Sequence, residues 1–159
     1  MTNKIKLFLT DVDGVMTDAG MYYTESGDEF KKFNTHDGMA FNLLREAGIK
    51  TGIITTENTK IVERRAAKLK VDYLYQGAGF SGKLSAAIEI CKQENITLHE
   101  VAYIGDDINC IELLESVGLA ACPANSTSKV KAIKNIISLT KSGGNGAIRE
   151  FVDNYILNK

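Results

Sequence analysis

The sequence lacks several features that would place it in a specialised class of protein. No apolar run approaches the ~20 residues that span a bilayer, and the first apolar run breaks at Asp11, too early for a signal peptide. Neither sign of charge is in excess, because the sequence has 19 Lys and Arg residues and 20 Asp and Glu residues. We therefore expect a cytoplasmic protein with no membrane partner and no nucleic-acid partner. A local cationic pocket for a small anionic molecule is compatible with this balance.

Cysteine is scarce as well, with three residues: Cys91, Cys110 and Cys122. An odd and widely spaced set predicts neither a disulfide framework nor a zinc site. Cys91 continues an apolar face with Leu84 and Ala87, which indicates a buried thiol. The length of 159 residues and the hydrophobic fraction of 44% suit one globular domain with a real core.

Apolar runs alternate with amphipathic stretches along the whole chain. The predicted strands are 6–10, 51–55, 73–75, 101–104, 119–121 and 136–139, and the predicted helices are 37–47, 58–69, 83–94, 108–117 and 147–155. This alternation predicts an α/β fold with a doubly wound, mostly parallel sheet and helices on both faces. A β-hairpin at about 20–34 is inserted after the first strand. No segment is large enough for a cap domain, so we expect a single domain over 1–159.

Polar residues cluster where a doubly wound fold binds its ligands, beyond the carboxyl ends of the strands. Alone, each of these residues is weak evidence, because Asp is common in turns and at helix caps and Lys is common on solvated helix starts. Their order and spacing together make coincidence improbable. The residues, strand by strand, are Asp11 and Asp13, then Thr55, then Lys83 at a helix start, then Asp106 and Asp107.

This set of residue types predicts phosphoryl transfer with a magnesium ion. Carboxylates brought close together repel one another unless a cation neutralises them, and hard oxygen ligands select Mg²⁺. Lys83 and Thr55 can bind the remaining phosphate oxygens, and Gly14 and Gly105 let the backbone approach. Positioning and charge neutralisation then supply most of the catalysis.

The motifs carry a specific resemblance. Residues 11–15 (DVDGV) resemble the first motif of the haloacid-dehalogenase-like superfamily, Thr55 its second, Lys83 its third and 105–107 (GDD) its fourth. Within that superfamily the chain is similar, nearly end to end, to the small capless phosphatases of 3-deoxy-2-keto sugar acid phosphates. Their substrates include octulosonate 8-phosphates and sialic-acid-type nonulosonate 9-phosphates.

The resemblance implies a role for each motif residue. Asp11 would attack phosphorus and form an aspartyl phosphate, and Asp13 would protonate the leaving oxygen and then activate water. The Asp11 and Asp106 carboxylates and the Asp13 carbonyl would hold Mg²⁺, supported by Asp107. Thr55 and Lys83 would bind phosphate.

The resemblance also implies a homotetramer, in which neighbouring subunits cover sites that lack a cap. The inserted hairpin suits this assembly role. The glycine-rich segment 143–146 either reaches toward a site, as in relatives, or is a flexible linker before the last helix, and the sequence leaves both interpretations open.

Three residues bear on which sugar acid is bound. Glu57, Arg65 and Lys68 resemble the substrate-contact set of the nonulosonate branch, whereas a solvated helix face would explain Arg65 and Lys68 equally well. We therefore favour a nine-carbon acid 9-phosphate as the substrate, with the eight-carbon 8-phosphate close behind.

Other functions account for the pattern less well. A signalling receiver domain places its phosphoacceptor Asp after the third strand, but here the acidic pair Asp106–Asp107 comes late. A dinucleotide-binding domain would need a GxGxxG turn after the first strand, which is absent. The alternative we retain is a non-catalytic oligomerisation module of cytidylyltransferase systems, although all four motifs are present.

Overall fold

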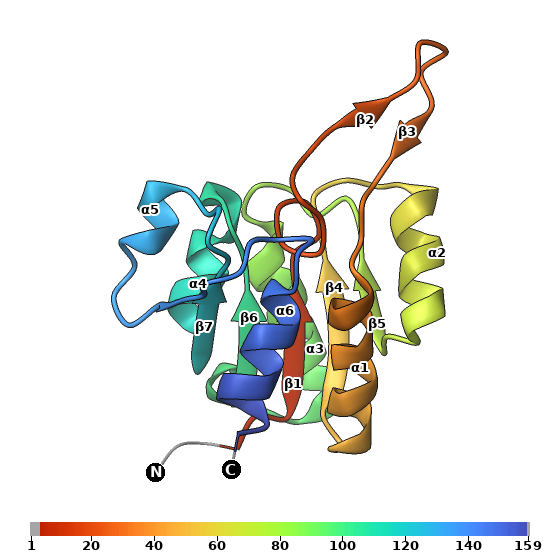
Figure 1. The fold of residues 1–159 in the computed structure, drawn as a ribbon. Coiled ribbons are helices and arrows are strands. Elements are labelled where there is room, and N and C mark those ends of the chain that lie inside the picture. Colours follow the sequence, from red (N-terminus) through yellow and green to blue (C-terminus); the bar gives the residue numbers. More distant parts are fainter. Residues whose placement is uncertain (1–3, 159) are drawn as a thin grey trace.

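The chain folds into three layers, with a parallel β-sheet between two layers of helices, in a computed structural model that describes residues 4–158 (Figure 1). The six strands of the sheet run in the order β5-β4-β1-β6-β7-β8, and every neighbouring pair is parallel. The strands are β1 (Leu7–Thr10), β4 (Lys50–Ile54), β5 (Tyr73–Tyr75), β6 (Val101–Ile104), β7 (Leu119–Cys122) and β8 (Ile137–Ser138).

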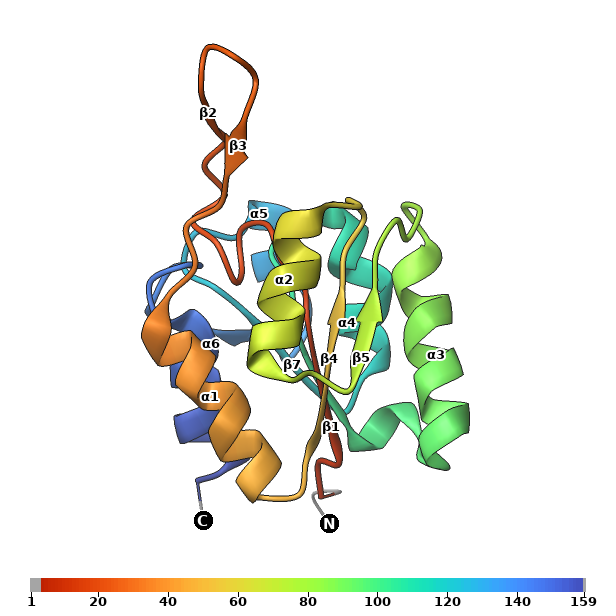
Figure 2. The same ribbon diagram turned by 90° about the vertical axis from the view of Figure 1, so that its right-hand side faces the viewer.

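Helices cover both faces of this sheet. One face carries α1 (Thr35–Glu46), α2 (Lys60–Leu69) and α6 (Ala147–Phe151), and the other carries α3 (Gly82–Glu94), α4 (Ile111–Ser116) and α5 (Ser128–Lys131). Figure 2 shows the two layers on opposite sides of the strands. The helical segments also include two 3₁₀ turns and one π-helical turn, which are Leu98–Glu100, Ile108–Cys110 and Val152–Ile156.

The central strands β1 and β6 are completely buried, because helices lie on both of their faces. Along β1, Phe8 points to one helical layer, where its ring packs against Phe41 and Phe151 with centroid distances of 5.8 and 6.3 Å. Leu7 and Leu9 point to the other layer. Burial on both sides explains why these strands appear as continuous apolar runs in the sequence.

The inserted hairpin stands away from the body of the molecule (Figures 1 and 2). It consists of β2 (Tyr22–Tyr23) and β3 (Glu29–Phe30), paired antiparallel. Four large apolar side chains on or beside it are about half exposed: Met21 (55%), Tyr22 (43%), Tyr23 (58%) and Phe30 (55%).

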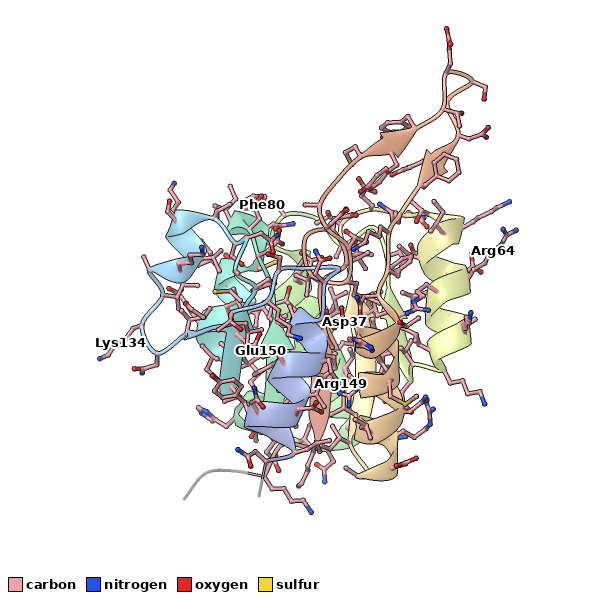
Figure 3. All side chains as sticks on the ribbon, in the orientation of Figure 1. Asp37, Arg64, Phe80, Lys134, Arg149 and Glu150 are labelled. Atoms are coloured by element: carbon pink, nitrogen blue, oxygen red, sulfur yellow. The ribbon has the colours of Figure 1, made fainter. Side chains whose placement is uncertain are left out.

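A buried carboxylate joins the first helix to the last. Asp37 on α1 is only 3% exposed, and its Oδ1 accepts a hydrogen bond of 2.9 Å from the Arg149 amide at the start of α6. Burial raises the pKa of Asp37, although the amides of Gly146, Ile148 and Arg149 oppose that shift. Figure 3 shows Asp37 and Arg149 beside one another between the two helices.

The structure confirms the predicted α/β class, the parallel sheet and the lack of a separate cap domain. The first helix begins at Thr35 and not at 37, because the Asn34 side chain caps it by accepting hydrogen bonds from two amides. The helix predicted at 108–117 starts as a 3₁₀ turn, and the four-residue helix α5 was not predicted, since it is too short to show a period. Within residues 4–158, no helix has the length and apolarity to cross a membrane.

Candidate active site

Asp11 lies directly after β1, at the carboxyl edge of the sheet. Its amide donates to the Ile104 carbonyl at the end of β6, which continues the strand pairing by one residue. The chain then turns tightly, and the Val12 carbonyl accepts hydrogen bonds from three successive amides, those of residues 15–17. Gly14 adopts φ +82° within this turn, a backbone region that favours glycine.

The Asp11 carboxylate is buried and held from three directions. Its Oδ1 accepts from the Val12 amide at 2.8 Å and forms an ion pair with Lys83 Nζ at 2.8 Å. Its Oδ2 accepts from the Cys110 thiol at 3.2 Å. The Lys83 side chain is only 2% exposed. Burial is the largest single influence and works against its charged form, but the neighbouring Asp11 and Cys110 together outweigh burial, so the pKa of Lys83 is raised.

A second carboxylate, Asp106, faces Asp11 from the loop after β6. Burial raises the pKa of Asp106 to about 7, and the negative charges of Asp11 and Asp107 add to this shift. Space around it is tight, because a Cβ atom on Gly14 would lie 1.9 Å from Asp106 Oδ2. A cation would relieve the repulsion between these carboxylates, and their oxygens are the ligands that a hard divalent ion prefers.

Ligand atoms of Asp11, Asp106 and Cys110 all lie within 4.8 Å of one another. The three residues come from the loop after β1, the loop after β6 and the 3₁₀ turn that follows it. The structure therefore brings two of the predicted metal ligands together at one point and adds a sulfur atom that the sequence analysis did not assign to the site.

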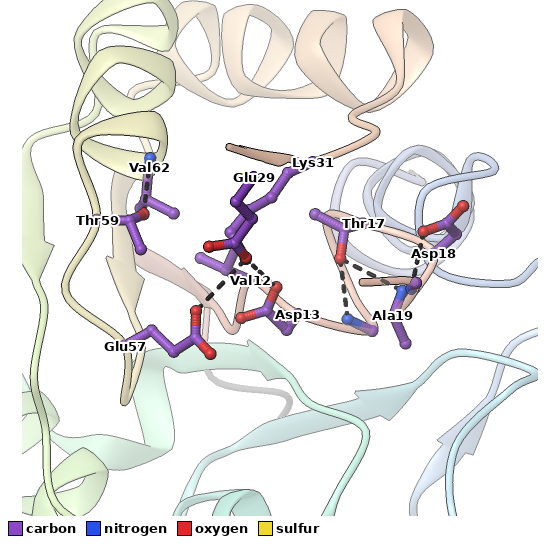
Figure 4. A network of polar contacts seen from close by, with 12 residues as sticks. Val12, Asp13, Thr17, Asp18, Ala19, Glu29, Lys31, Glu57, Thr59 and Val62 are labelled. Atoms are coloured by element: carbon purple, nitrogen blue, oxygen red, sulfur yellow. Dashed lines mark hydrogen bonds and ion pairs between the residues drawn. The ribbon is translucent and has the colours of Figure 1, made fainter. Parts of the chain in front are cut away.

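Asp13 takes part in a separate ionic cluster, built around Lys31 (Figure 4). Lys31 Nζ lies 2.7 Å from Asp13 Oδ1, 3.3 Å from Glu29 Oε1 and 3.5 Å from Glu57 Oε2. The Lys31 side chain is 2% exposed. Desolvation disfavours its charge, but the hydrogen bond to Asp13 and the charges of Asp13 and Glu57 prevail, so the pKa of Lys31 is raised.

Sequence reasoning missed Lys31. The residue immediately follows β3, and the hairpin carries it back over the loop that holds Asp13. The only signal in the sequence was a Lys–Lys pair at the end of an inserted hairpin, which normally indicates solvated charge.

Thr55 and Asp107 lie at the same edge of the sheet. Thr55 follows β4 and is 1% exposed, and its amide donates to the Tyr75 carbonyl at 2.9 Å. Asp107 is exposed and caps the 3₁₀ turn, since its Oδ1 accepts from the Ile108 amide at 2.7 Å. The described contacts of Asp107 thus support the local backbone beside Asp106.

The three residues predicted to select the substrate occupy different surroundings. Glu57 lies in the Lys31 cluster. Arg65 on α2 donates to the Asn34 carbonyl at 3.3 Å, and its guanidinium lies 5.2 Å from the centre of the Phe33 ring. Lys68 is exposed in the last turn of α2, roughly 12 Å of helical rise from the helix start at the site edge.

The segment 143–146 packs against the loop that carries the first motif. The Gly144 amide donates to the Val15 carbonyl at 3.1 Å, and the Gly143 amide donates to Asn125 Oδ1 at 2.7 Å. A Cβ atom on Gly143 would lie 2.1 Å from the Gly14 carbonyl oxygen. Within this subunit the segment is therefore a support for its own Asp11–Thr17 loop.

Comparisons with known proteins agree with one another. Residues 77–151 match the family described as haloacid dehalogenase-like hydrolase. The chain is 35% identical over 153 residues to the 3-deoxy-D-manno-octulosonate 8-phosphate phosphatase KdsC of Escherichia coli strain K12, covering 96% of this chain and 80% of that one.

The similar solved structures are phosphatases of the same family. The crystal structure of 3-deoxy-D-manno-octulosonate 8-phosphate phosphatase from Moraxella catarrhalis, in complex with magnesium ion, phosphate ion and KDO, is 36% identical with a TM-score of 0.87, covering 93% of this chain and 83% of that one. A probable YrbI family phosphatase from Pseudomonas syringae is 38% identical with a TM-score of 0.89, covering 95% and 84%.

Proposed function

This chain belongs to the haloacid dehalogenase-like hydrolases, and we propose that it is a magnesium-dependent phosphatase of 3-deoxy-D-manno-octulosonate 8-phosphate. The observation that carries this proposal is the buried Asp11 carboxylate, held by Lys83 at 2.8 Å and faced by Asp106 at the carboxyl edge of the sheet. An anionic nucleophile, a fixed ammonium group and a cation site together form the apparatus of phosphoryl transfer.

Asp11 acts as the nucleophile. One of its carboxylate oxygens attacks phosphorus, the bond between phosphorus and the sugar oxygen breaks, and the phosphoryl group is left on Asp11. The Val12 amide and Lys83 fix the orientation of the carboxylate before substrate arrives. Lys83 and Thr55 then bind the oxygens of the transferring group, so that little reorganisation is needed in the transition state.

Asp13 transfers the protons of the two half-reactions. It gives a proton to the departing sugar oxygen and later takes one from the water that attacks the phosphoryl group and frees Asp11. Lys31 positions this carboxylate through their 2.7 Å contact.

The carboxylates of Asp11 and Asp106 and the carbonyl of Asp13 would hold Mg²⁺, with Asp107 beside them. When bound, Mg²⁺ neutralises charge on these groups and on the phosphate. The fit rests on the partly buried Asp106, which faces Asp11 and Asp107; burial and these two negative charges raise its pKa to about 7, and a divalent cation would offset that charge. Gly14 leaves the space that such a ligand set needs.

The substrate assignment follows the named relatives, which act on the eight-carbon acid phosphate. It is tested by phosphate release from a panel with Mg²⁺ present: octulosonate 8-phosphate, a nonulosonate 9-phosphate and p-nitrophenyl phosphate. A kcat/KM for octulosonate 8-phosphate at or below that for p-nitrophenyl phosphate would contradict the proposal.

A nine-carbon acid 9-phosphate is the second candidate, because Glu57 lies within the cluster around Asp13 and can accept a hydrogen bond from a sugar hydroxyl or amide. Arg65 and Lys68 support this candidate less, since Arg65 is engaged with the base of the hairpin and Lys68 lies at the far end of α2. If Lys68 does meet the substrate carboxylate, Lys68→Ala will lower kcat/KM for sugar acid phosphates and leave p-nitrophenyl phosphate hydrolysis unchanged. Equal losses on both would assign Lys68 a structural role.

We further propose that the protein acts as a homotetramer with the hairpin at an interface. The support is the exposed aromatic and methionine surface of the hairpin, which a monomer would leave in water.

A site that retains Asp11, Asp13, Lys83 and Asp106 in these positions does not favour the alternative of a non-catalytic oligomerisation module.

A further inference from the structure

Asn125 bridges two backbone segments that meet at the first motif. Its Nδ2 donates to the Gly14 carbonyl at 3.1 Å, and its Oδ1 accepts from the Gly143 amide at 2.7 Å. Both partners are backbone groups of buried glycines, so their chemistry fixes which way the side-chain amide points. Among the described residues neither glycine group has another hydrogen-bond partner, and Asn125 therefore satisfies both.

Gly14 immediately follows Asp13, and its backbone is held on both sides. The Gly14 amide, which belongs to the same peptide group as the Asp13 carbonyl, donates to Thr17 Oγ1 at 3.2 Å. The Gly14 carbonyl is held by Asn125. Glycine at φ +82° has wide conformational freedom, so these two contacts restrict the peptide beside Asp13 where the residue itself does not.

We propose that Asn125 is a positioning residue for the phosphatase reaction, which acts through Gly14 on the backbone that carries the Asp13 side chain. The inference rests on the proposed function, in which Asp13 protonates the leaving oxygen. Asn125 itself stays out of contact with the reacting atoms and sets where Asp13 stands.

The loop that carries Asn125 is anchored close to the second acidic motif. It follows β7, and the chain's one proline, Pro123, restricts the backbone two residues before Asn125. The Thr127 amide donates to the Asp106 carbonyl at 3.0 Å. Because one short loop contacts both Gly14 and Asp106, it fixes the first-motif loop relative to the fourth-motif loop.

The surroundings of Asn125 separate this role from core packing. Asn125 is exposed, whereas Gly14 and Gly143 are buried. Truncation of its side chain should therefore leave the hydrophobic core intact. The loss falls on two buried backbone groups that then lack a partner, one of which adjoins Asp13.

The leaving group distinguishes positioning of Asp13 from general support. A sugar alcohol oxygen must gain a proton to depart, whereas p-nitrophenolate leaves readily without one. At saturating Mg²⁺, Asn125→Ala should lower kcat/KM for octulosonate 8-phosphate by about fivefold to tenfold, as expected for one lost hydrogen bond. For p-nitrophenyl phosphate the loss should stay below about twofold, because that reaction depends little on the acid.

Two further variants complete the kinetic comparison. Ser126→Ala is the matched control, since Ser126 is the next residue on the same loop and its hydroxyl is hydrogen-bonded to neither glycine. It should retain wild-type kcat/KM on both substrates. Asn125→Gln keeps the side-chain amide and should lose less on octulosonate 8-phosphate than Asn125→Ala does. Thermal unfolding checks that each variant is folded.

Calorimetric titration with Mg²⁺ gives a measurement that needs no turnover. The Asp13 carbonyl would hold the ion and lies in the peptide group next to the one that Asn125 restrains. Asn125→Ala should therefore weaken Mg²⁺ binding by about threefold or more, and Ser126→Ala should leave it unchanged.

The inference is overturned by equal losses on both substrates, by wild-type kcat/KM in Asn125→Ala, by loss of its fold, or by unchanged Mg²⁺ affinity. A wild-type protein that binds Mg²⁺ but hydrolyses neither substrate would contradict the proposed function instead. The calorimetric comparison of Asn125→Ala with Ser126→Ala would still decide the role of Asn125, so the two failures are distinguishable.

Discussion

Replacing Lys31 by methionine should slow the enzyme without unfolding it. Methionine is similar in length and apolar, so it fills the space of the side chain, which is 2% exposed, but it leaves Asp13, Glu29 and Glu57 without their common cation. Asp13 then loses its 2.7 Å contact with Lys31, which in the proposed mechanism positions it toward the leaving oxygen.

The size of the effect can be bounded from the exposure of the partners. Breaking a fully buried ion pair costs about 3–5 kcal/mol, whereas an exposed pair is worth about 0–1 kcal/mol. Lys31 is buried, but the side chains of Asp13 and Glu57 are 35% and 43% exposed. We therefore take a value between these limits, about 2 kcal/mol, which corresponds to a roughly 30-fold loss in kcat/KM if it is felt wholly at Asp13.

The assay compares steady-state kinetics of Lys31→Met, Lys31→Arg and Lys32→Met, with thermal unfolding as a check on folding. Lys32 is a matched control on the same segment, because its ammonium contacts Gly144 and Asn145 and not the Asp13 cluster. Arginine keeps the charge and should recover part of the activity. The reasoning fails if Lys31→Met retains wild-type kcat/KM, or if Lys32→Met loses as much.

Further outcomes are expected from the same geometry. Asp11→Asn should remain folded and lose turnover, because an amide cannot form the acyl phosphate; wild-type rates from a pure sample would exclude the mechanism. EDTA should stop activity and Mg²⁺ restore it. Asp106 has a pKa of about 7 without metal and must lose its proton to bind an ion. The apparent affinity for Mg²⁺ should therefore weaken by up to about tenfold per pH unit below pH 7 and level off above it. Calorimetry that shows equal affinity at pH 5.5 and pH 8 would contradict this. Tyr23→Ser with Phe30→Ser should reduce the oligomer seen by light scattering, and a fully active wild-type monomer would exclude the proposed tetramer.

The sequence predicted the sheet and the placement of the acidic motifs because both follow from local rules. Buried strands are continuous apolar runs, and parallel strands bring their carboxyl ends to one edge. Asp11, Lys83 and Asp106 could therefore be assigned to one site before any coordinates were known. The start of α2 follows a local rule as well, since the Thr59 side chain caps the helix by accepting a hydrogen bond from the Val62 amide.

The remaining features depended on tertiary geometry. Lys31 lies 18 residues from Asp13, and only the direction of the hairpin brings it back to the site. Cys110 is 99 residues from Asp11, and the spacing of the three cysteines carried no sign of a mixed oxygen and sulfur cluster. The sequence showed that Arg65 and Lys68 share a helix, but not that the base of the hairpin packs against Arg65.

The contacts of 143–146 and of Asp37 also have a consequence for how the protein is made. A ribosome releases the Asp11–Thr17 loop early, yet the glycines that support that loop and the Arg149 amide that donates to Asp37 are synthesised more than 100 residues later. Contacts that span 112 residues cannot form until residues 143–149 have been synthesised. The nascent chain should thus carry Asp11 without a finished site, and phosphatase activity should appear only after α6 has emerged and docked.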